Sequence, residues 1–205
     1  MPLKLNNKNI DIKAVAKKAQ KDDKLLAELL GNLRSKNETI RYKSHKVLYF
    51  ISEQQPKVLY SKWDFFTELL NSDNTYHKLS SIQLIANLTK ADTKNKFEKT
   101  FDKFYNLLDD KSFITAAYVA AASGKIAKAN PKLQTKITNK LLNIDKTHHD
   151  PERKDLVKGS AIESFKEYFD QTKNKKKIID FARKQLKSKS PKSKKIAKEF
   201  LEKFG

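Results

Sequence analysis

Hydrophobic residues recur every three or four positions along most of the chain, and short polar breaks interrupt this pattern about every 14 to 18 residues. This spacing is typical of amphipathic helices, whereas half-buried strands alternate every second residue. The breaks are rich in Ser, Asn and Asp, whose side chains accept hydrogen bonds from the free backbone N–H groups at a helix start. Breaks that we expect to contain such caps are residues 35–37, 72–74, 109–112 and 188–191. The pattern predicts an all-α protein.

The predicted helices form five antiparallel pairs, which we expect at about residues 22–34 and 38–54, 56–71 and 74–90, 93–108 and 112–129, 131–143 and 154–170, and 173–187 and 191–204. A short helix at about residues 10–19 is expected to cap the N-terminal end. One pair cannot bury its own apolar stripe, so neighbouring pairs must stack to form the core.

A repeat becomes visible when equivalent leucines are compared. Leu33, Leu70 and Leu108 each end the first helix of a pair, with spacings of 37 and 38 residues, and Leu142 and Leu186 extend the series less regularly. HEAT and armadillo repeats have periods of about 40 to 47 residues. On this helix spacing, the chain resembles the HEAT-repeat and armadillo-like family over most of its length.

The resemblance implies a right-handed α-α superhelix, a solenoid of stacked helix pairs. We expect a single domain over residues 1–205, in which residues 1–21 contain the capping helix and residues 171–205 form a strongly basic last repeat. The Asp and Arg typical of the second helix in HEAT repeats are mostly absent, so armadillo-like and other superhelical subclasses remain open.

The core is expected where the second helices present their apolar stripes. The residues chosen are Val47, Leu48, Ile51, Leu84, Ile85, Leu88, Ile162, Phe165 and Phe169. The second helix of the third pair is different because it is rich in Ala and contains Gly124. Small residues allow two helices to approach closely, so we expect large neighbours, such as Phe101 and Phe104, to fill the remaining space.

Positive charge is the strongest compositional signal, with a net charge of +20. Only 4 of the 44 basic residues are arginine, and lysine suits attraction to phosphate better than base-specific contacts. Residues 171–205 contain 13 basic and 3 acidic residues, a net charge of +10, whereas residues 61–110 contain 7 basic and 8 acidic residues. We therefore expect the strongest electrostatic attraction at the C-terminal end.

Several classes of site have no support in the sequence. There is no cysteine, which excludes disulfides, thiolate metal sites and cysteine nucleophiles. Catalytic motifs and phosphate-binding glycine loops are not found, and we expect no catalytic residue, cofactor or metal. The pairs Asp22-Asp23 and Asp109-Asp110 are interpreted as helix caps. No stretch approaches the roughly 18 apolar residues that span a bilayer, and the N-terminus lacks the pattern of a signal peptide, so a cytoplasmic protein is expected.

The candidate binding residues are basic positions on the second helices and on the last pair, because second helices of α-solenoids commonly line the concave face. They are Arg41, His45, Lys78, Lys125, Lys158, Lys175, Lys176, Lys177, Arg183, Lys184, Lys192, Lys194, Lys195 and Lys198.

Two other motifs are interpreted as structural. His148-His149-Asp150 lies in the longest connection, residues 145–153, and is interpreted as a solvated loop because no further His or Cys lies nearby in the sequence. Trp63-Asp64 is compared with the alkylpurine DNA glycosylases built from HEAT-like repeats, which hold damaged DNA with tryptophans, an aspartate and an arginine. This chain is similar in architecture, size and charge but has one tryptophan, so we expect Trp63 in the core.

These observations favour a non-catalytic scaffold that binds an acidic protein or peptide segment. The alternative is sequence-nonspecific binding of DNA or RNA through lysines, and a HEAT-like alkylpurine DNA glycosylase is a minor alternative.

Overall fold

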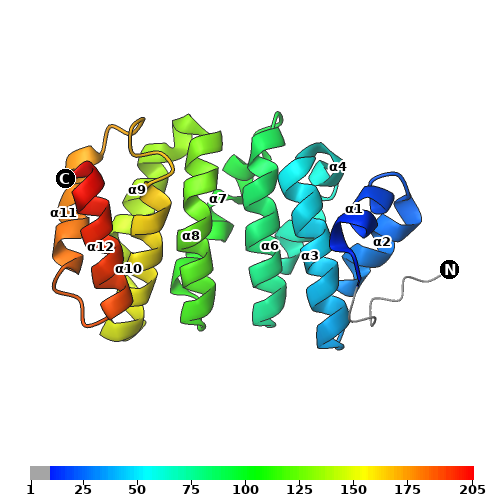
Figure 1. Ribbon diagram of the computed structural model, residues 1–205, viewed down its shortest axis with the longest axis horizontal. Coiled ribbons are helices and arrows are strands. Elements are labelled where there is room, and N and C mark those ends of the chain that lie inside the picture. Colours follow the sequence, from blue (N-terminus) through cyan, green and yellow to red (C-terminus); the bar gives the residue numbers. More distant parts are fainter. Residues whose placement is uncertain (1–9) are drawn as a thin grey trace. The chain divides into compact units, whose positions relative to one another are not determined.

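The computed structural model describes residues 10–205, so residues 1–9 of the predicted N-terminal cap lie outside the described part of the chain. Every regular element from residue 10 onwards is an α-helix or a short 3-10 helix (Figure 1), which confirms the all-α prediction. The chain divides into two compact units, an N-terminal unit up to Lys96 and a C-terminal unit from Phe97 to Gly205. The expectation of a single domain stays a prediction.

The N-terminal unit is built around helix α3. Its elements are α1 (Ile12–Ala19), α2 (Asp23–Asn32), α3 (Glu38–Gln54), α4 (Pro56–Tyr60), α5 (Trp63–Leu69), α6 (Thr75–Leu88) and the 3-10 helix η1 (Thr89–Ala91). Helix α3 packs against α1, α2, α4 and α6, and α6 also packs against α5. The pairs α2 with α3 and α4/α5 with α6 are the first two predicted repeats.

The predicted helix at 56–71 is broken into α4 and α5 by a turn at Ser61 and Lys62. Leu59, Trp63 and Phe66 lie on both sides of the turn, and all three are buried. The apolar stripe therefore continues through the break, so the hydrophobic spacing gave no sign of the bend.

The C-terminal unit has the same construction. Its elements are α7 (Lys96–Asn106), η2 (Leu107–Asp109), α8 (Phe113–Ala129), η3 (Pro131–Leu133), α9 (Gln134–Leu142), η4 (Ile144–Lys146), α10 (Pro151–Phe165), α11 (Lys175–Gln185) and α12 (Pro191–Phe204). Helix α10 packs between α8 and α12 (Figure 1), and these three second helices form what we call the α8–α10–α12 layer. The predicted helix at 154–170 is displaced, since α10 begins at Pro151 and ends at Phe165.

Polar side chains begin most of the second helices, as the breaks predicted. In α1, α2, α3, α6, α10 and α12 the residue before the helix accepts a hydrogen bond from a backbone N–H of the first turn, which satisfies a group that the helix itself leaves free. These residues are Asp11, Asp22, Asn37, Asn74, Asp150 and Ser190. Ser112, before α8, makes no such side-chain bond.

Close helix contacts in the C-terminal unit depend on two glycines. A Cβ atom at Gly124 of α8 would lie 2.6 Å from the backbone oxygen of Ser164 on α10. A Cβ atom at Gly159 of α10 would lie 2.7 Å from Ser193 Oγ on α12. Both distances are shorter than any normal contact, so a side chain at either position would push the helices apart. The predicted role of small residues in close helix packing is confirmed at Gly124.

The predicted core residues of the second helices are all buried. Of the repeat leucines, Leu33, Leu70 and Leu108 are buried as well, but Leu186 after α11 is 42% exposed. Within residues 10–205 no helix combines the length and apolar character needed to cross a membrane.

Candidate binding surfaces

The predicted basic residues of the N-terminal unit do not form an accessible positive surface. The Arg41 guanidinium lies over the ring of Tyr76, 4.7 Å from its centroid, and its Nη1 donates to the Ser35 carbonyl at 2.9 Å. Burial lowers the pKa of His45 to about 4, and Lys78 is buried. The structure therefore corrects the placement of His45 and Lys78, which lie within the helix packing instead of on an open face.

Lys158 requires the same correction. Its Nζ lies 2.8 Å from Asp145 Oδ1 and 3.2 Å from Asp155 Oδ1, and its side chain is only 10% exposed. A buried ammonium group must be paired because water no longer solvates it. Lys158 thus connects the η4 segment to α10, and the two aspartates neutralise its charge within the unit. Lys125, the remaining second-helix lysine, is half-buried on α8.

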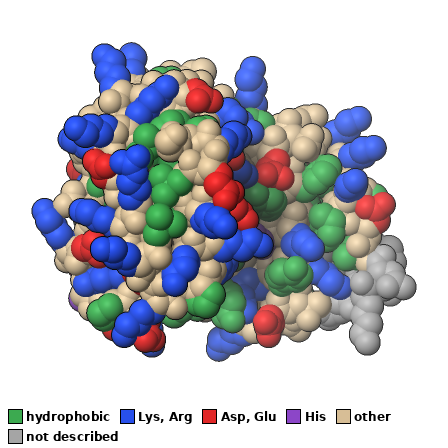
Figure 2. Space-filling model, turned by 60° about the vertical axis from the view of Figure 1, so that its left-hand side comes forward, with side chains coloured by type: hydrophobic (Ala, Val, Ile, Leu, Met, Phe, Trp, Pro, Cys, Tyr) green, Lys and Arg blue, Asp and Glu red, His purple; other side chains and the backbone are tan. Residues whose placement is uncertain are grey.

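The predicted residues of the last helix pair are all exposed. They are Lys175, Lys176, Lys177, Arg183 and Lys184 on α11, and Lys192, Lys194, Lys195 and Lys198 on α12. Figure 2 shows the C-terminal end turned toward the viewer, where lysine and arginine side chains alternate with hydrophobic and acidic ones. Some charges are compensated locally, such as Arg183 by Asp180 at 3.6 Å, but such exposed pairs contribute little.

A shallow apolar groove lies on the α8–α10–α12 layer. Its volume is about 200 Å³, and its lining residues are Phe113, Ile114, Ala117, Tyr118, Leu156, Ser160, Lys192, Ser193 and Ile196. Ile114, Tyr118 and Leu156 are among the large hydrophobic residues that the structure leaves exposed, with Leu156 at 36%. The lining residues come from three neighbouring helices, α8, α10 and α12. Of these lining residues only Lys192 was predicted from the sequence, since helical spacing does not show which apolar side chain is exposed.

Positive groups surround this groove. Lys192 is part of its lining, and the Arg153 guanidinium lies 5.2 Å from the centroid of the Phe113 ring. The N-termini of α8 and α12 add the positive ends of two helix dipoles. Asp150 and Glu152 at the start of α10 offset part of this field. The groove combines apolar contacts with a positive rim, and it is smaller than the roughly 300 to 1,000 Å³ of pockets that enclose small molecules.

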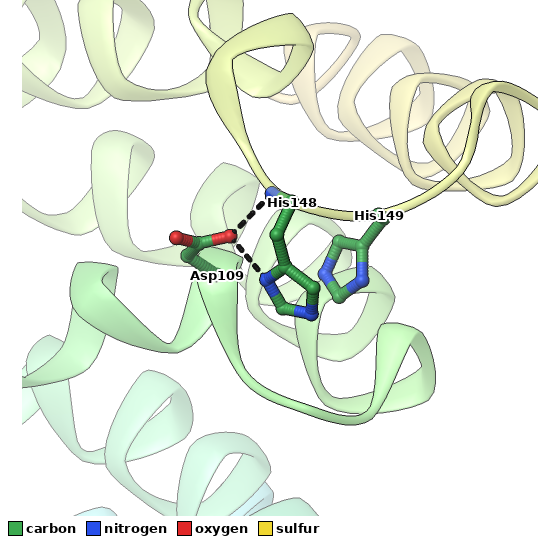
Figure 3. Close-up of side chains that lie close together, drawn as sticks. All are labelled: Asp109, His148 and His149. Atoms are coloured by element: carbon green, nitrogen blue, oxygen red, sulfur yellow. Dashed lines mark hydrogen bonds and ion pairs between the residues drawn. The ribbon is translucent and has the colours of Figure 1, made fainter.

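A second site is the histidine cluster, which consists of Asp109, His148 and His149 (Figure 3). One ligand atom from each residue lies within 4.8 Å of the other two. Asp109 Oδ1 accepts hydrogen bonds from the His148 backbone N–H at 2.7 Å and lies 2.6 Å from His148 Nδ1. The two imidazole rings are 4.3 Å apart between centroids, and both come from the segment between η4 and α10.

This arrangement corrects the prediction of a solvated loop. His149 is only 4% exposed, and its Nε2 lies 3.2 Å from the Leu108 carbonyl oxygen. Burial lowers the pKa of the His149 imidazole, and the neighbouring His148 lowers it further. The His148 backbone N–H is the main cause that lowers the pKa of the Asp109 carboxyl, against the effect of burial. Asp109 therefore binds the next repeat and is not the helix cap that the sequence suggested.

The spacing of Asp109 and His148 along the sequence could have predicted that they lie close together. Asp109 and His148 are 39 residues apart, close to one repeat, so both lie just after the first helix of successive pairs. Stacking places equivalent positions of neighbouring repeats side by side. A search for histidine and acidic residues one period apart would have connected them.

Trp63 lies in the core, as expected. It is 1% exposed, while Asp64 on the following position is exposed and lies 3.5 Å from Lys96 Nζ. A buried Trp63 cannot stack on a DNA base, so the feature that motivated the glycosylase comparison is not available for DNA.

The sequence matches none of the protein-family models compared, and no curated protein matches it. Solved structures do resemble it. A designed armadillo repeat protein in complex with the peptide (KR)4 superposes with a TM-score of 0.64 at 16% identity, covering 95% of this chain and 90% of that chain. A second designed armadillo repeat protein gives a TM-score of 0.57 at 15% identity, with coverages of 98% and 97%. An engineered protein gives 0.54 at 15% identity, with coverages of 95% and 92%.

The chain therefore has an armadillo or HEAT-like solenoid fold, which confirms the predicted fold class. Solenoids of this kind suit the binding of other proteins, since successive second helices present a continuous surface. Identities this low define the fold and leave the ligand to be argued from the surface of this chain.

Proposed function

We propose that the protein is a non-catalytic repeat scaffold that binds an acidic peptide segment of a partner protein in the apolar groove of the α8–α10–α12 layer. The groove is the observation that supports this proposal. Ile114, Tyr118 and Leu156 offer apolar contacts for one or two side chains of a peptide, and Lys192 with Arg153 offers positive charge beside them. Such a combination favours a peptide in which hydrophobic anchors alternate with Asp or Glu.

A structurally similar protein gives a second reason for this proposal. The designed armadillo repeat protein described above binds a peptide, (KR)4, which is basic. The last repeat of this chain, residues 171–205, carries a net charge of +10, so electrostatic complementarity favours a peptide of the opposite sign here. In this proposal the exposed residues Lys194, Lys195 and Lys198 on α12 attract the acidic segment, while the groove holds its apolar side chains.

The test is a selection of peptides by the wild-type chain from a random library, followed by affinity measurement on two leucine variants. Leu156→Asp places a carboxylate in the groove, and Leu186→Asp places one at a similarly exposed leucine outside the groove. We expect the selected peptides to be acidic with apolar anchors, and to lose affinity for Leu156→Asp but not for Leu186→Asp. Selection of basic peptides, or equal binding to both variants, would contradict the proposal.

A second function rests on the exposed lysines. Lys175, Lys176 and Lys177 occupy the first turn of α11, which contains no acidic residue, so their charges add to the positive end of the helix dipole. This arrangement supports sequence-nonspecific attraction to the phosphates of DNA or RNA. Duplex and single-stranded nucleic acids should then bind at low salt, and the affinity should fall steeply as salt rises.

A triple variant separates this function from peptide binding. Replacing Lys175, Lys176 and Lys177 by Gln should weaken nucleic-acid binding and reduce its salt dependence, while the selected peptides keep their affinity. Failure to bind any nucleic acid at low salt would exclude this second function.

A further inference from the structure

The histidine cluster joins two successive repeats of the C-terminal unit. Asp109 ends η2 of one repeat, and His148 and His149 follow η4 of the next. We infer that Asp109, His148 and His149 form a binding site for a divalent transition-metal ion, with Zn²⁺ as the ion that the donor set fits best. This inference is independent of the proposed peptide binding, because none of the three residues lines the apolar groove.

The chemistry of the donors fits Zn²⁺. Imidazole nitrogen and carboxylate oxygen are its ordinary ligands together with thiolate, and two imidazoles with one carboxylate leave a fourth position for water. Hard cations such as Mg²⁺ and Ca²⁺ prefer all-oxygen sites, which this cluster does not offer.

A hydrogen bond orients the His149 ring for metal binding. Its Nε2 lies 3.2 Å from the carbonyl oxygen of Leu108, which can only accept, so this contact favours the tautomer with the proton on Nε2 and a lone pair on Nδ1. Metal-binding histidines generally have such an outer partner, which fixes the tautomer and the ring orientation. The position of His149 in the packed interior makes it the fixed member of the site.

His148 and Asp109 are the adjustable members. Both are exposed, and a hydrogen bond of 2.6 Å joins His148 Nδ1 to Asp109 Oδ1. Two ligands of one tetrahedral Zn²⁺ lie roughly 3.3 Å apart, given bond lengths of about 2.0 Å. The cluster spans at most 4.8 Å, so rotation of these two exposed side chains is sufficient to close it. An ion between Nδ1 and Oδ1 displaces the proton that they share, and this proton leaves to solvent.

Nearby lysines limit the affinity. Lys140 and Lys146 line a groove of about 380 Å³ that also includes Asp109 and Thr147, and their charges oppose a cation. A bound ion would nevertheless connect η2 to the segment before α10. Because unfolded chains lack the assembled site, binding should stabilise the contact between these two repeats.

The experiment uses the full chain without a histidine tag, freed of metal by a chelator and then titrated with ZnCl₂ in a calorimeter. We expect one bound ion per chain and a thermal unfolding midpoint that rises with the Zn²⁺ concentration. Two variants test the ligands. His148→Ala removes an exposed ring, and Asp109→Asn keeps an oxygen that accepts from the His148 N–H. Each should weaken binding by about tenfold or more.

His77→Gln in the N-terminal unit is the matched control, and it should bind Zn²⁺ like the wild type. The chain has four histidines, so imidazole ¹⁵N spectra can follow each one separately. His148 and His149 should shift on addition of Zn²⁺, while His45 and His77 stay unchanged. Absence of binding, or wild-type affinity for Zn²⁺ in both His148→Ala and Asp109→Asn, would overturn the inference.

Discussion

The second helices of the two units use their basic residues in opposite ways. In the N-terminal unit, Arg41 lies on Tyr76, and His45 and Lys78 lie within the packing. In the C-terminal unit, α12 exposes its lysines beside an apolar groove, whereas Lys158 of α10 is buried in an ion pair. The same repeat position can therefore be buried in one repeat and exposed in another. What decides between them is the depth at which the neighbouring repeat covers the side chain.

The largest difference in unfolding free energy is expected between two leucines that end first helices. Leu70 in the N-terminal unit is 2% exposed, whereas Leu186 in the C-terminal unit is 42% exposed. Leu70→Ala should lower the free energy of unfolding by about 3 kcal/mol, because it leaves a cavity. Leu186→Ala should change it by less than about 0.5 kcal/mol. Urea denaturation of the two variants measures both, and equal losses would show that the repeats are equivalent at this position.

His45 makes the stability of the N-terminal unit dependent on pH. Its pKa is about 4 when folded, because burial and, to a smaller extent, Lys46 disfavour the charged ring, while a hydrogen bond with Gln83 opposes this shift. The ordinary value is 6.5, so below that pH the unfolded chain binds a proton that the folded chain does not. The contribution is complete above pH 6.5 and is lost as the pH falls towards 4.

This loss should reach about 2 kcal/mol at pH 5 and about 3 kcal/mol at pH 4. Denaturation at pH 7 and pH 5, in the presence of a chelator, compares the wild type with His45→Gln. The variant should lose less stability between the two pH values by about 2 kcal/mol. Identical pH profiles would mean that the His45 ring is solvated in the folded protein.

A substitution at Lys158 tests how much its buried ion pair contributes to the stability of the C-terminal unit. Burial raises the pKa of Asp155, but hydrogen bonds from Ser188 and Lys158 outweigh this and lower it. Lys158→Met removes one charge and leaves Asp155 partly buried without its ammonium partner. The free energy of unfolding should fall by about 2 kcal/mol. Lys184→Met on the exposed face of α11 is the control and should be nearly neutral.

The smallest expected changes in stability concern two glycines, one in each unit. Gly124→Ala in α8 places a Cβ atom against the backbone of α10 and should destabilise the protein by about 1 to 2 kcal/mol. Gly31→Ala in α2 meets no atom within 4 Å and should stabilise it by about 0.5 to 1 kcal/mol, because alanine loses less backbone entropy in a helix. Thermal unfolding of both variants gives the signs, and a destabilising Gly31→Ala would contradict this account.

The helices, the repeat and the core could be predicted from the pattern of residues along the chain. Local spacing, caps such as Asp22 and buried positions such as Val47 and Ile85 could be predicted, because helix formation and burial of one face depend on residues three or four apart. The same local information identified the exposed lysines of α11 and α12 correctly, since they lie opposite the apolar stripes of these helices.

Which polar side chains are buried, and which of them contact one another, became clear only from the tertiary structure. Lys158 faces two aspartates, and Asp109 meets His148 from the next repeat, through contacts that stacking creates between residues far apart in the sequence. The groove around Leu156 depends equally on three helices, so the spacing within α10 could not reveal it. Burial of a side chain is a property of its neighbours in space, and a one-dimensional pattern records only its neighbours along the chain.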